Sequence, residues 1–467
     1  MTDRTDASLV EHIDMGAPAS FVWDYDARRP RLSKLYEKSK TMQWNAATDI
    51  DWSVDIDPGK MSDELVARMA AVEFDFGTRA VGAFARSSPE NRWLLEAHSH
   101  AWTVSNFMHG EQGALVATAK ICAGVESIDD KYYAAAQVAD EARHVEAYQR
   151  YLDKIDIRYP VATYLHQLLD EVVAHPHVDM TFLGMQILVE GVALAAFSMG
   201  GAMFGNPVIG KITDLVRRDE ARHVAFGVLS LQGTYDDMDP VDLAEREDFI
   251  LEACALMRDR FVPVDVYERL GIDVARAVAE YETSPDQAAF RSLMFSKVVP
   301  NLGKLGLLTP KVRAGFEKMG ILRYERYVDS ATEAGELAPG EGVSGSEHPF
   351  VTFRAALASV DRIAPEPVLQ VVASGADLGV LAGIEPALIR LHVTGVDDGD
   401  WVVRLAPEAI TYAATSEDSA VDVTLTMDVE TWTDIVAGRK TAPAAVMEGK
   451  IDLAGDVMKA LVLDSLL

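Results

Sequence analysis

The most informative chemical feature of the sequence is a pentapeptide that occurs twice. Asp-Glu-Ala-Arg-His fills positions 140–144 and, 79 residues later, positions 219–223. On a helix, a Glu and a His three residues apart project from the same face and can bind one metal ion. One such pair is weak evidence in a chain with 11 histidines. The identical second copy predicts a site for two metal ions.

A two-metal site of this kind takes one further Glu from each of two other helices. Glu111 precedes Glu141 by thirty residues. Glu190 precedes Glu220 by the same interval, and it is the only charged residue in the segment 180–210. A buried carboxylate needs a positive partner, because burying it alone is costly. We therefore predict six metal ligands: Glu111, Glu141, His144, Glu190, Glu220 and His223.

The donor atoms of this set indicate which metals to expect. Four carboxylates balance the charge of two Fe(II) ions, and oxygen donors with two imidazoles favour iron or manganese over zinc. A histidine that binds a metal commonly donates its other N–H to a carboxylate, so we expect Asp140 and Asp219 beside the ligands. We expect Arg143 and Arg222 to pair with acidic groups near the cluster, with surface ion pairs as the alternative.

Tyr148 follows Glu141 by seven residues and falls on the metal-facing stripe of its helix. The matching position in the second half is Gly227. A tyrosine at this position could be oxidised by the metal cluster. The alternative is a packed aromatic ring with a hydrogen-bonded hydroxyl, with Gly227 simply leaving room. Three histidines upstream of Glu111 are expected to have packing or surface roles: His98, His100 and His109.

The elements that must position these residues are helices. Apolar residues recur at helical spacing from about 88 to 328, with helix-start signals at Ser88-Pro89, Ser127 and Asn206-Pro207. The segment 1–87 is expected to supply a strap and the leading helices. The segment 329–347 holds four glycines without an apolar period and is predicted to be a linker.

Beyond the linker the hydrophobic period changes to two. Apolar and polar residues alternate over 389–394 and again over 421–428, which indicates half-buried strands. Short helices are expected around 431–437 and 456–467. The fold class predicted is thus a mainly α N-terminal helical bundle followed by a smaller α+β domain over 348–467.

Composition excludes several classes of function. The 467 residues are 49% hydrophobic and 25% charged, as in folded soluble proteins. A net charge of −30 repels nucleic acids and anionic membranes. The uncharged run 191–210 is long enough to cross a bilayer, but its five glycines and Asn206-Pro207 favour the end of one buried helix and the start of another. Two cysteines and a polar N-terminus lead us to expect a cytoplasmic protein.

The six-ligand pattern, the paired pentapeptide and a Trp-containing strap, 43–52, resemble the ferritin-like di-iron carboxylate oxygenases. This superfamily includes bacterial multicomponent hydroxylases, the ribonucleotide reductase small subunit and p-aminobenzoate N-oxygenase. The resemblance covers roughly residues 35 to 325. It implies a ferritin-like four-helix bundle that binds two iron ions, or an iron and a manganese ion, with O2 as co-substrate.

The chain departs from each of these three groups. Leu194 stands where the hydroxylases have a Thr, and Val216 stands where the N-oxygenases add a third His. The reductase subunit usually has Asp at the position of Glu111, although its radical tyrosine falls at Tyr148. Since none of the three patterns fits fully, the resemblance does not imply a substrate class.

The C-terminal domain resembles the sterol carrier protein type 2 fold through its strand order and the stretch 444–456. Such domains enclose an apolar tunnel for lipids or fatty acyl chains, which a terminal helix over 457–466 would close. The alternative is a dimerisation or docking module with a filled tunnel.

These features together predict an O2-dependent di-iron oxidoreductase of the monooxygenase type. Its expected substrate is hydrophobic: a fatty acyl, sterol or polyketide-like compound that is hydroxylated, desaturated or otherwise oxidised. No flavin or nicotinamide fingerprint accompanies the ligands, so a reductase or ferredoxin is expected as electron donor. The alternatives are a radical-generating or ligand-binding oxidase, a ferroxidase, and a lipid carrier with a structural metal site. A homodimer remains open as the assembly.

Overall fold

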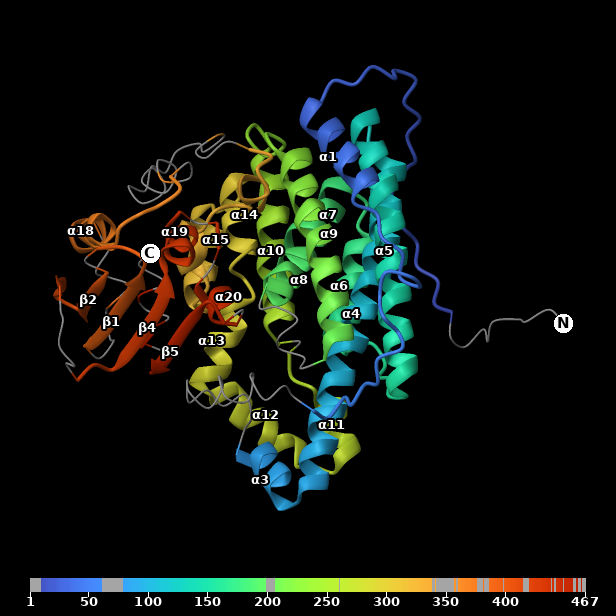
Figure 1. The fold of residues 1–467 in the computed structure, drawn as a ribbon. Coiled ribbons are helices and arrows are strands. Elements are labelled where there is room, and N and C mark those ends of the chain that lie inside the picture. Colours follow the sequence, from blue (N-terminus) through green and yellow to red (C-terminus); the bar gives the residue numbers. More distant parts are fainter. Residues whose placement is uncertain are drawn as a thin grey trace.

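The computed structural model describes a helical N-terminal region and a C-terminal domain built on a five-stranded sheet (Figure 1). The fold class predicted from the sequence is confirmed. Each part has its own apolar core. The described residues are 10–60, 79–198, 206–259, 261–337, 360–375, 386–397, 399–414, 420–437, 439–440, 442–447 and 449–456, with the single positions 341, 357, 381, 459, 460 and 463.

The predicted metal ligands lie on helices that run side by side in the helical region (Figure 1). These helices are α4 (Pro89–Gly124), α5 (Ile128–Ile155), α8 (Glu190–Ser198) and α9 (Pro207–Leu231). Three of them begin at the predicted residues. The Ser88 and Ser127 hydroxyls accept from the backbone N–H groups three residues on, at 3.0 and 3.4 Å. The Asn206 side chain accepts from the N–H of Val208 at 2.8 Å, and each bond satisfies an N–H that the helix leaves without a partner.

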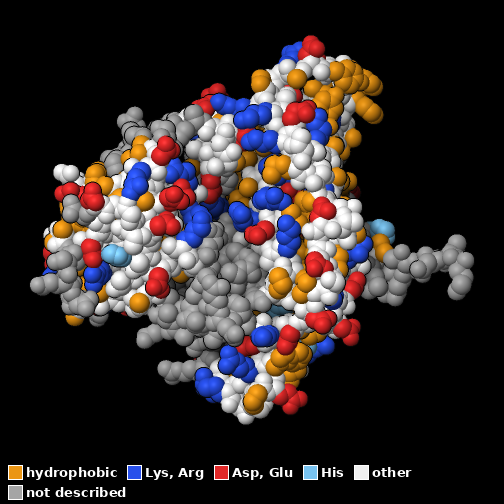
Figure 2. Space-filling view, in the orientation of Figure 1, with side chains coloured by type: hydrophobic (Ala, Val, Ile, Leu, Met, Phe, Trp, Pro, Cys, Tyr) orange, Lys and Arg blue, Asp and Glu red, His pale blue; other side chains and the backbone are white. Residues whose placement is uncertain are grey.

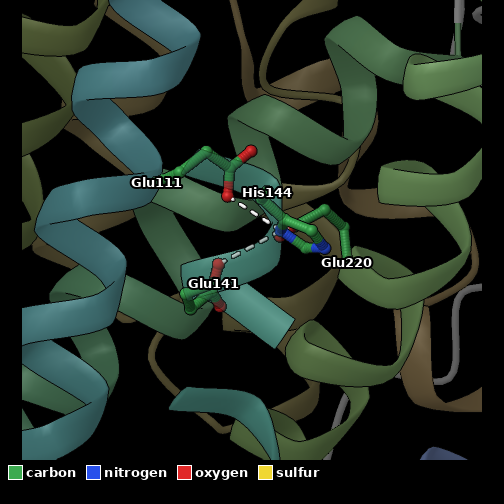
Figure 3. Close-up of side chains that lie close together, drawn as sticks. All are labelled: Glu111, Glu141, His144 and Glu220. Atoms are coloured by element: carbon green, nitrogen blue, oxygen red, sulfur yellow. Dashed lines mark hydrogen bonds and ion pairs between the residues drawn. The ribbon is translucent and has the colours of Figure 1, made fainter. Parts of the chain in front are cut away.

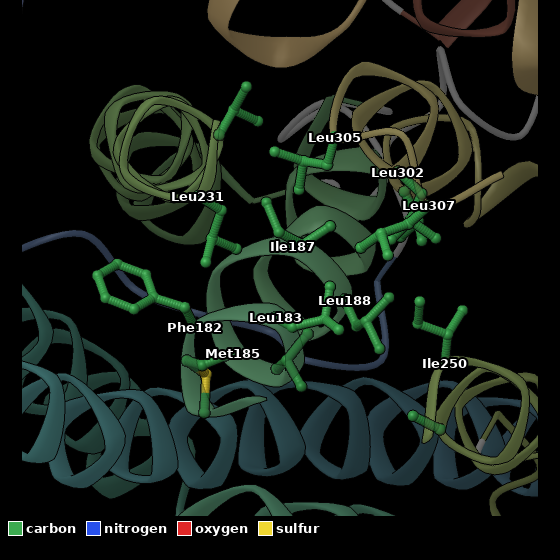
Figure 4. Close-up of a cluster of buried hydrophobic side chains, with 14 of the residues drawn as sticks. Phe182, Leu183, Met185, Ile187, Leu188, Leu231, Ile250, Leu302, Leu305 and Leu307 are labelled. Atoms are coloured by element: carbon green, nitrogen blue, oxygen red, sulfur yellow. The ribbon is translucent and has the colours of Figure 1, made fainter. Parts of the chain in front are cut away.

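The helix that leads to Glu190 contains a π-helical segment. Helix α7 (Val178–Phe182) continues into a π-helix (Leu183–Val189) and then into α8. The apolar pattern predicted an ordinary helix here. All seven residues of the π-helical segment are buried. Its five apolar side chains belong to the hydrophobic cluster of which Figure 4 draws a part. The span Val178–Phe197 is apolar and long enough to cross a membrane, and 89% of its most apolar window is buried inside the structure.

An N-terminal helix and strap cover the outside of this arrangement. Helix α1 (Pro30–Thr41) packs against α5 and α9. In the segment that follows, Trp44, Ala46 and Ile50 are buried in the helical core. The remaining elements of the helical region are α3 (Arg79–Ser87), α6 (Thr163–Ala174), α10 (Pro240–Asp259), α11 (Val264–Leu270), α12 (Val274–Thr283), α13 (Pro285–Leu293), α14 (Val298–Lys304), α15 (Pro310–Met319) and a 3-10 turn (Leu322–Arg326).

The segment expected as a linker, 329–347, begins with structure that belongs to the helical region. Asp329 accepts a hydrogen bond from the N–H of Thr332 at 2.9 Å and starts the short helix α16 (Ser330–Glu333). Helix α16 packs against α9, and Leu337 is also buried. The helical region therefore extends beyond residue 328, because an Asp cap and a few apolar residues suffice to dock one more turn.

The C-terminal sheet has the order β3-β2-β1-β4-β5, in which β1 and β4 are parallel and the other pairs antiparallel. Its strands are β1 (Ala387–Thr394), β2 (Asp400–Ala406), β3 (Ala409–Ala414), β4 (Val423–Asp428) and β5 (Ile451–Gly455). Alternate residues of β1 and β4 are buried, as predicted. The domain also contains α18 (Pro365–Gly375), α19 (Val429–Val436) and α20 (Ala442–Met447). The helix expected at 456–467 falls largely outside the described residues.

The surface carries charges of both signs. On the face drawn in Figure 2, acidic and basic side chains are interspersed, and hydrophobic side chains gather over the extended segment that precedes α1. Within that segment Phe21, Trp23 and Tyr25 are exposed. The net charge of −30 is thus not gathered into one acidic patch on this face.

Candidate metal centre

The six predicted ligands come together inside the helical region, and four of them are drawn in Figure 3. Helix α4 supplies one residue, α5 two, the start of α8 one and α9 two. All six residues are at most 6% exposed. Their donor atoms form two groups within metal-binding distance of one another. The first group is Glu111, Glu141, His144 and Glu220, and the second is Glu141, Glu190 and His223.

In the first group, one nitrogen of His144 faces the carboxylates. Its Nδ1 lies 3.0 Å from Glu111 Oε2, 3.3 Å from Glu141 Oε2 and 3.4 Å from Glu220 Oε1. Its Nε2 lies 3.1 Å from Asp219 Oδ2 on the opposite side of the ring. When Nε2 donates its proton to Asp219, the lone pair of Nδ1 is directed at the site.

The second group repeats this arrangement around His223. Its Nδ1 lies 3.1 Å from Glu141 Oε1 and 3.5 Å from Glu220 Oε1, and its Nε2 lies 3.3 Å from Asp140 Oδ2. The two oxygens of Glu141 therefore face the two different histidines. The aspartates are exchanged between the copies of the pentapeptide, because each contacts the histidine of the other copy.

The buried atoms of the cluster fit two bound cations. Among the described residues, Glu141 Oε2, Glu190 Oε2, both oxygens of Glu220 and Nδ1 of His223 have no hydrogen-bond partner. Burial raises the pKa of Glu190 well above its usual value, and the charge of Glu220 raises it further. Burial also raises the pKa of Glu111. Carboxylates packed this closely need positive charge beside them, and two divalent ions would supply it.

The aspartates and arginines of the repeat form a network behind the histidines. Arg143 donates to Asp140 and, at 3.2 Å, to Asp219, and Arg222 also donates to Asp219. Burial alone would raise the pKa of Asp219, but the hydrogen bond with His144 and the nearby positive charges lower it. The Arg143 and Arg222 side chains are only 11% and 6% exposed. The alternative of surface ion pairs is therefore wrong.

Four residues that contact this network were not predicted as part of the site. Trp44 of the strap donates its indole N–H to Asp219 Oδ2 at 2.7 Å, and Gln43 donates to Asp140 Oδ1 at 3.0 Å. Two buried amides, Gln137 and Gln186, donate to the ligand carboxylates. A sequence signal for these amides exists, because Gln137 and Gln186 each stand four residues before a ligand Glu on an inward-facing stripe.

Tyr148 is fully buried next to the first group, and its hydroxyl has no hydrogen-bond partner among the described residues. Burial raises its pKa well above the usual value, so the phenol stays protonated. At the matching position, a Cβ on Gly227 would lie 2.5 Å from Cβ of Gln186. Gly227 thus leaves the room that Gln186 occupies.

The three upstream histidines bond away from the cluster. His98 and His100 lie 2.8 and 2.7 Å from the hydroxyls of Tyr159 and Tyr151. His109 lies 3.0 Å from the carbonyl oxygen of Tyr159. These contacts confirm the packing roles expected for them.

A pocket reaches the cluster between α4 and the helix that carries Glu190. It touches three of the ligands, Glu111, Glu190 and Glu220, and its remaining lining is almost entirely apolar. Gly110 is part of the lining, and a Cβ added to it would meet no atom within 4 Å, so this residue borders open space. The other lining residues are Asn106, Phe107, Ala114, Val189, Ala193 and Phe197.

Comparison with known protein families accounts for both parts of the chain. The family model of P-aminobenzoate N-oxygenase AurF matches residues 26–306, which is more than half of the sequence. The chain belongs to this family. All six candidate ligands of this AurF-family chain fall inside the match. The model of the SCP-2 sterol transfer family matches residues 369–467, so the AurF-type domain is followed by an SCP-2 domain.

Solved structures similar to the AurF-family chain include R2-like ligand-binding oxidases. A mutant of such an oxidase with an aerobically reconstituted Mn/Fe cofactor is 18% identical, and the match covers 58% of this chain and 94% of that chain with a TM-score of 0.36. The R2-like ligand-binding oxidase from Sulfolobus acidocaldarius is 19% identical, with 56% and 90% covered and a TM-score of 0.34. A search of curated proteins finds no match.

Proposed function

We propose that this AurF-family chain is a di-metal oxidase or oxygenase that uses O2 to oxidise an apolar substrate held beside Glu111, Glu190 and Glu220. The observation that carries the proposal is the buried cluster itself, in which carboxylate oxygens without hydrogen-bond partners surround two imidazole nitrogens. Such a cluster is costly unless metal ions occupy it.

Each residue of the cluster has a distinct role in this proposal. Glu111, His144 and Glu220 would hold one ion, Glu190 and His223 would hold the other, and Glu141, which belongs to both groups, would be shared between them. When bound, iron or manganese ions supply the electrons for reducing O2. Asp219 and Asp140 accept the Nε2–H protons of the histidines and so keep the Nδ1 lone pairs available.

The walls of the pocket support an apolar substrate. Phe107 and Phe197 pack edge to face with ring centroids 4.9 Å apart, and both line the pocket with Ala193 and Val189. These side chains exclude water and leave Asn106 as the uncharged polar group of the lining. We propose that the SCP-2 domain binds the same class of hydrophobic compound, and that a reductase or ferredoxin delivers the electrons.

Metal content and O2 consumption test the proposal. The apoprotein is loaded with Fe(II) without oxygen, its iron is counted, and O2 uptake is followed after mixing. We expect two iron ions per chain and O2 uptake that Glu220→Ala and His223→Ala abolish, whereas Asp248→Ala, whose side chain is 62% exposed, changes neither. One metal per chain, or a preference for zinc, would contradict the proposal.

A second candidate function is a radical-generating oxidase. The buried Tyr148 hydroxyl, which lacks a hydrogen-bond partner beside the cluster, favours it. In that case, oxygenation of the Fe(II)-loaded protein would produce a tyrosyl signal in electron paramagnetic resonance, and Tyr148→Phe would remove the signal without changing the iron content. An oxygenase without a stable radical would show no such signal in either protein.

A lipid carrier with a structural metal site is distinguished by ligand binding. Fatty-acid binding by the whole chain should survive Glu220→Ala whether the chain is an oxygenase or a carrier. An oxygenase should lose substrate turnover in this variant, whereas a carrier has no turnover to lose. Mass spectrometry of compounds that co-purify with the chain identifies the ligand class.

A further inference from the structure

Two buried amides converge on one oxygen of Glu190. Gln137 Nε2 donates to Glu190 Oε1 at 2.8 Å and to Glu141 Oε1 at 2.9 Å. Gln186 Nε2 donates to the same Glu190 Oε1 at 3.3 Å. Both glutamines are completely buried. Oε1 of Glu190 is thus occupied by two donors, while Oε2 has no partner among the described residues.

The other half of the site has no matching amides. The 79-residue offset between the two halves relates Glu111 to Glu190, so Phe107 takes the place of Gln186. Val216 takes the place of Gln137 in the helix that carries Glu220. Neither Phe nor Val can donate a hydrogen bond. The ligand types are therefore duplicated, but the surroundings of the two metal positions differ.

The surrounding structure holds the Gln186 amide in place. Gln186 lies in the π-helical segment, whose apolar side chains pack into the cluster of Figure 4. On the facing helix, Gly227 leaves the space beside Gln186, since an added Cβ would lie 2.5 Å from Cβ of Gln186 and 3.1 Å from its Cγ. Real Cβ atoms do not approach other atoms to 2.5 Å, so any larger residue at position 227 must displace this side chain.

We propose that Gln137 and Gln186 are positioning residues that hold Glu190 through Oε1 and leave only Oε2 free for a metal ion. Glu190 is then set in place before the metal arrives, whereas the hydrogen-bond partner of Glu111 among the described residues is His144, itself a candidate ligand. In the described residues, no amide outside the ligand set fixes the Glu111 carboxylate. The metal position formed by Glu190, His223 and Glu141 should therefore bind its ion more tightly than the position of Glu111 and His144. This inference rests on the proposed di-metal function.

Anaerobic titration of the apoprotein with Mn(II) tests the proposal. Free Mn(II) and coupled Mn(II) pairs are distinguished by electron paramagnetic resonance. The wild-type chain should bind two ions in two steps of different affinity. Gln137→Leu and Gln186→Leu should each weaken the tighter step by about 10- to 100-fold, the range found when contacts to ligating side chains are removed.

Two further variants separate the amide contact from simple packing. Gly227→Ala keeps the Gln186 amide but forces it to move, so it should weaken the same step. Val216→Ala is the control, because it removes buried atoms at the counterpart of Gln137 without touching an amide, and both steps should stay unchanged. If Gln137→Leu fails to fold, Gln137→Asn retracts the amide by one methylene and should give the same loss.

The possible failures are distinguishable. If the wild-type chain binds fewer than two Mn(II) ions, the proposed function itself fails. If it binds two ions, and the Gln137, Gln186 and Gly227 variants bind them with unchanged affinities, the di-metal site stands and the positioning role is wrong. A loss in Val216→Ala as large as that in Gln137→Leu would also overturn it, because packing alone would then explain the effect.

Discussion

Trp44 and Trp52 lie in the same strap and both donate an indole N–H, but their acceptors differ in charge. Trp44 donates to the Asp219 carboxylate and Trp52 to the carbonyl oxygen of Ala46, each at 2.7 Å. Hydrogen bonds to charged groups contribute about 1.5–3 kcal/mol, and neutral ones about 0.5–1.5 kcal/mol. We expect Trp44→Phe to lower the free energy of unfolding by the larger amount and Trp52→Phe by the smaller, measured by urea unfolding. Equal decreases in the free energy of unfolding would show that the lost ring volume, and not the charge of the acceptor, determines the effect.

His100 should make stability fall in acid. Burial lowers its pKa from 6.5 to about 4, and its Nε2 lies 2.7 Å from the Tyr151 hydroxyl. Between pH 6.5 and pH 4 the unfolded chain therefore binds a proton that the folded chain does not, so the free energy of unfolding decreases as the pH falls through this window. The pKa difference corresponds to at most about 3 kcal/mol.

The matched variant for this pH effect is His100→Gln, which keeps a polar group near Tyr151 but does not titrate. As the pH is lowered from 7 to 4, the free energy of unfolding of the wild type should decrease more than that of the variant. Parallel pH profiles would show that His100 is not responsible.

At the scale of residues, the candidate ligands could be predicted because Glu and His are the side chains that metal chemistry requires, and their spacing is repeated. The amides could not be predicted with the same force. An uncharged Gln in an apolar helix has no obligatory partner, and the role of Gln137 emerges only where α5 meets the helix of Glu190. For Gly227, the sequence predicted only that a missing side chain leaves space. The structure shows that Gln186 fills this space.

At the scale of elements, the N-terminal cap of α9 allows a test of how much this helix start contributes to the stability of the chain. This helix carries Glu220 and His223, and Asn206 caps it through the N–H of Val208. We expect Asn206→Ala to destabilise the chain by about 0.5–2 kcal/mol, and Asn206→Gly by only a few tenths of a kcal/mol. Thermal unfolding measures both. If Asn206→Gly lowers the free energy of unfolding as much as Asn206→Ala, the hydrogen bond between Asn206 and Val208 does not account for the stability of this helix start.

Helix starts were predictable because Ser, Asn and Pro act locally, through bonds to N–H groups two or three residues away. The π-helical segment was not. Every residue of Leu183–Val189 is buried, so the segment shows no exposed polar face from which the helical period could be read. The short helix α16 was missed for a related reason, because only its Asp329 cap distinguishes it from a linker.

At the scale of the whole molecule, the separate cores predict that the sheet domain can be disrupted alone. A Cβ on Gly399 would lie 2.0 Å from the carbonyl oxygen of Val393, whose N–H donates to Gly399 at 2.7 Å. Backbone atoms cannot yield without breaking the β1–β2 pairing, so Gly399→Ala should unfold this domain. Limited proteolysis should then remove the C-terminal domain, while the metal content of the remaining chain stays at the wild-type value.

The control for this experiment is Gly395→Ala in the same turn. Its nearest neighbour is a methyl of Val429 at 3.4 Å, and its positive φ of 87° adds a strain of about 1–2 kcal/mol. The sheet domain of this variant should remain folded. Loss of metal in Gly399→Ala would show that the two domains depend on each other.

Because each aspartate contacts the histidine of the other pentapeptide, neither half of the repeat forms a complete site by itself. A fragment holding one copy would leave its own histidine without a carboxylate on the outer nitrogen, since that carboxylate belongs to the other copy. Two such fragments paired about a twofold axis would restore both contacts at once. The internal repeat is thus interlocked in the manner of a symmetric dimer whose subunits have been joined into one polypeptide.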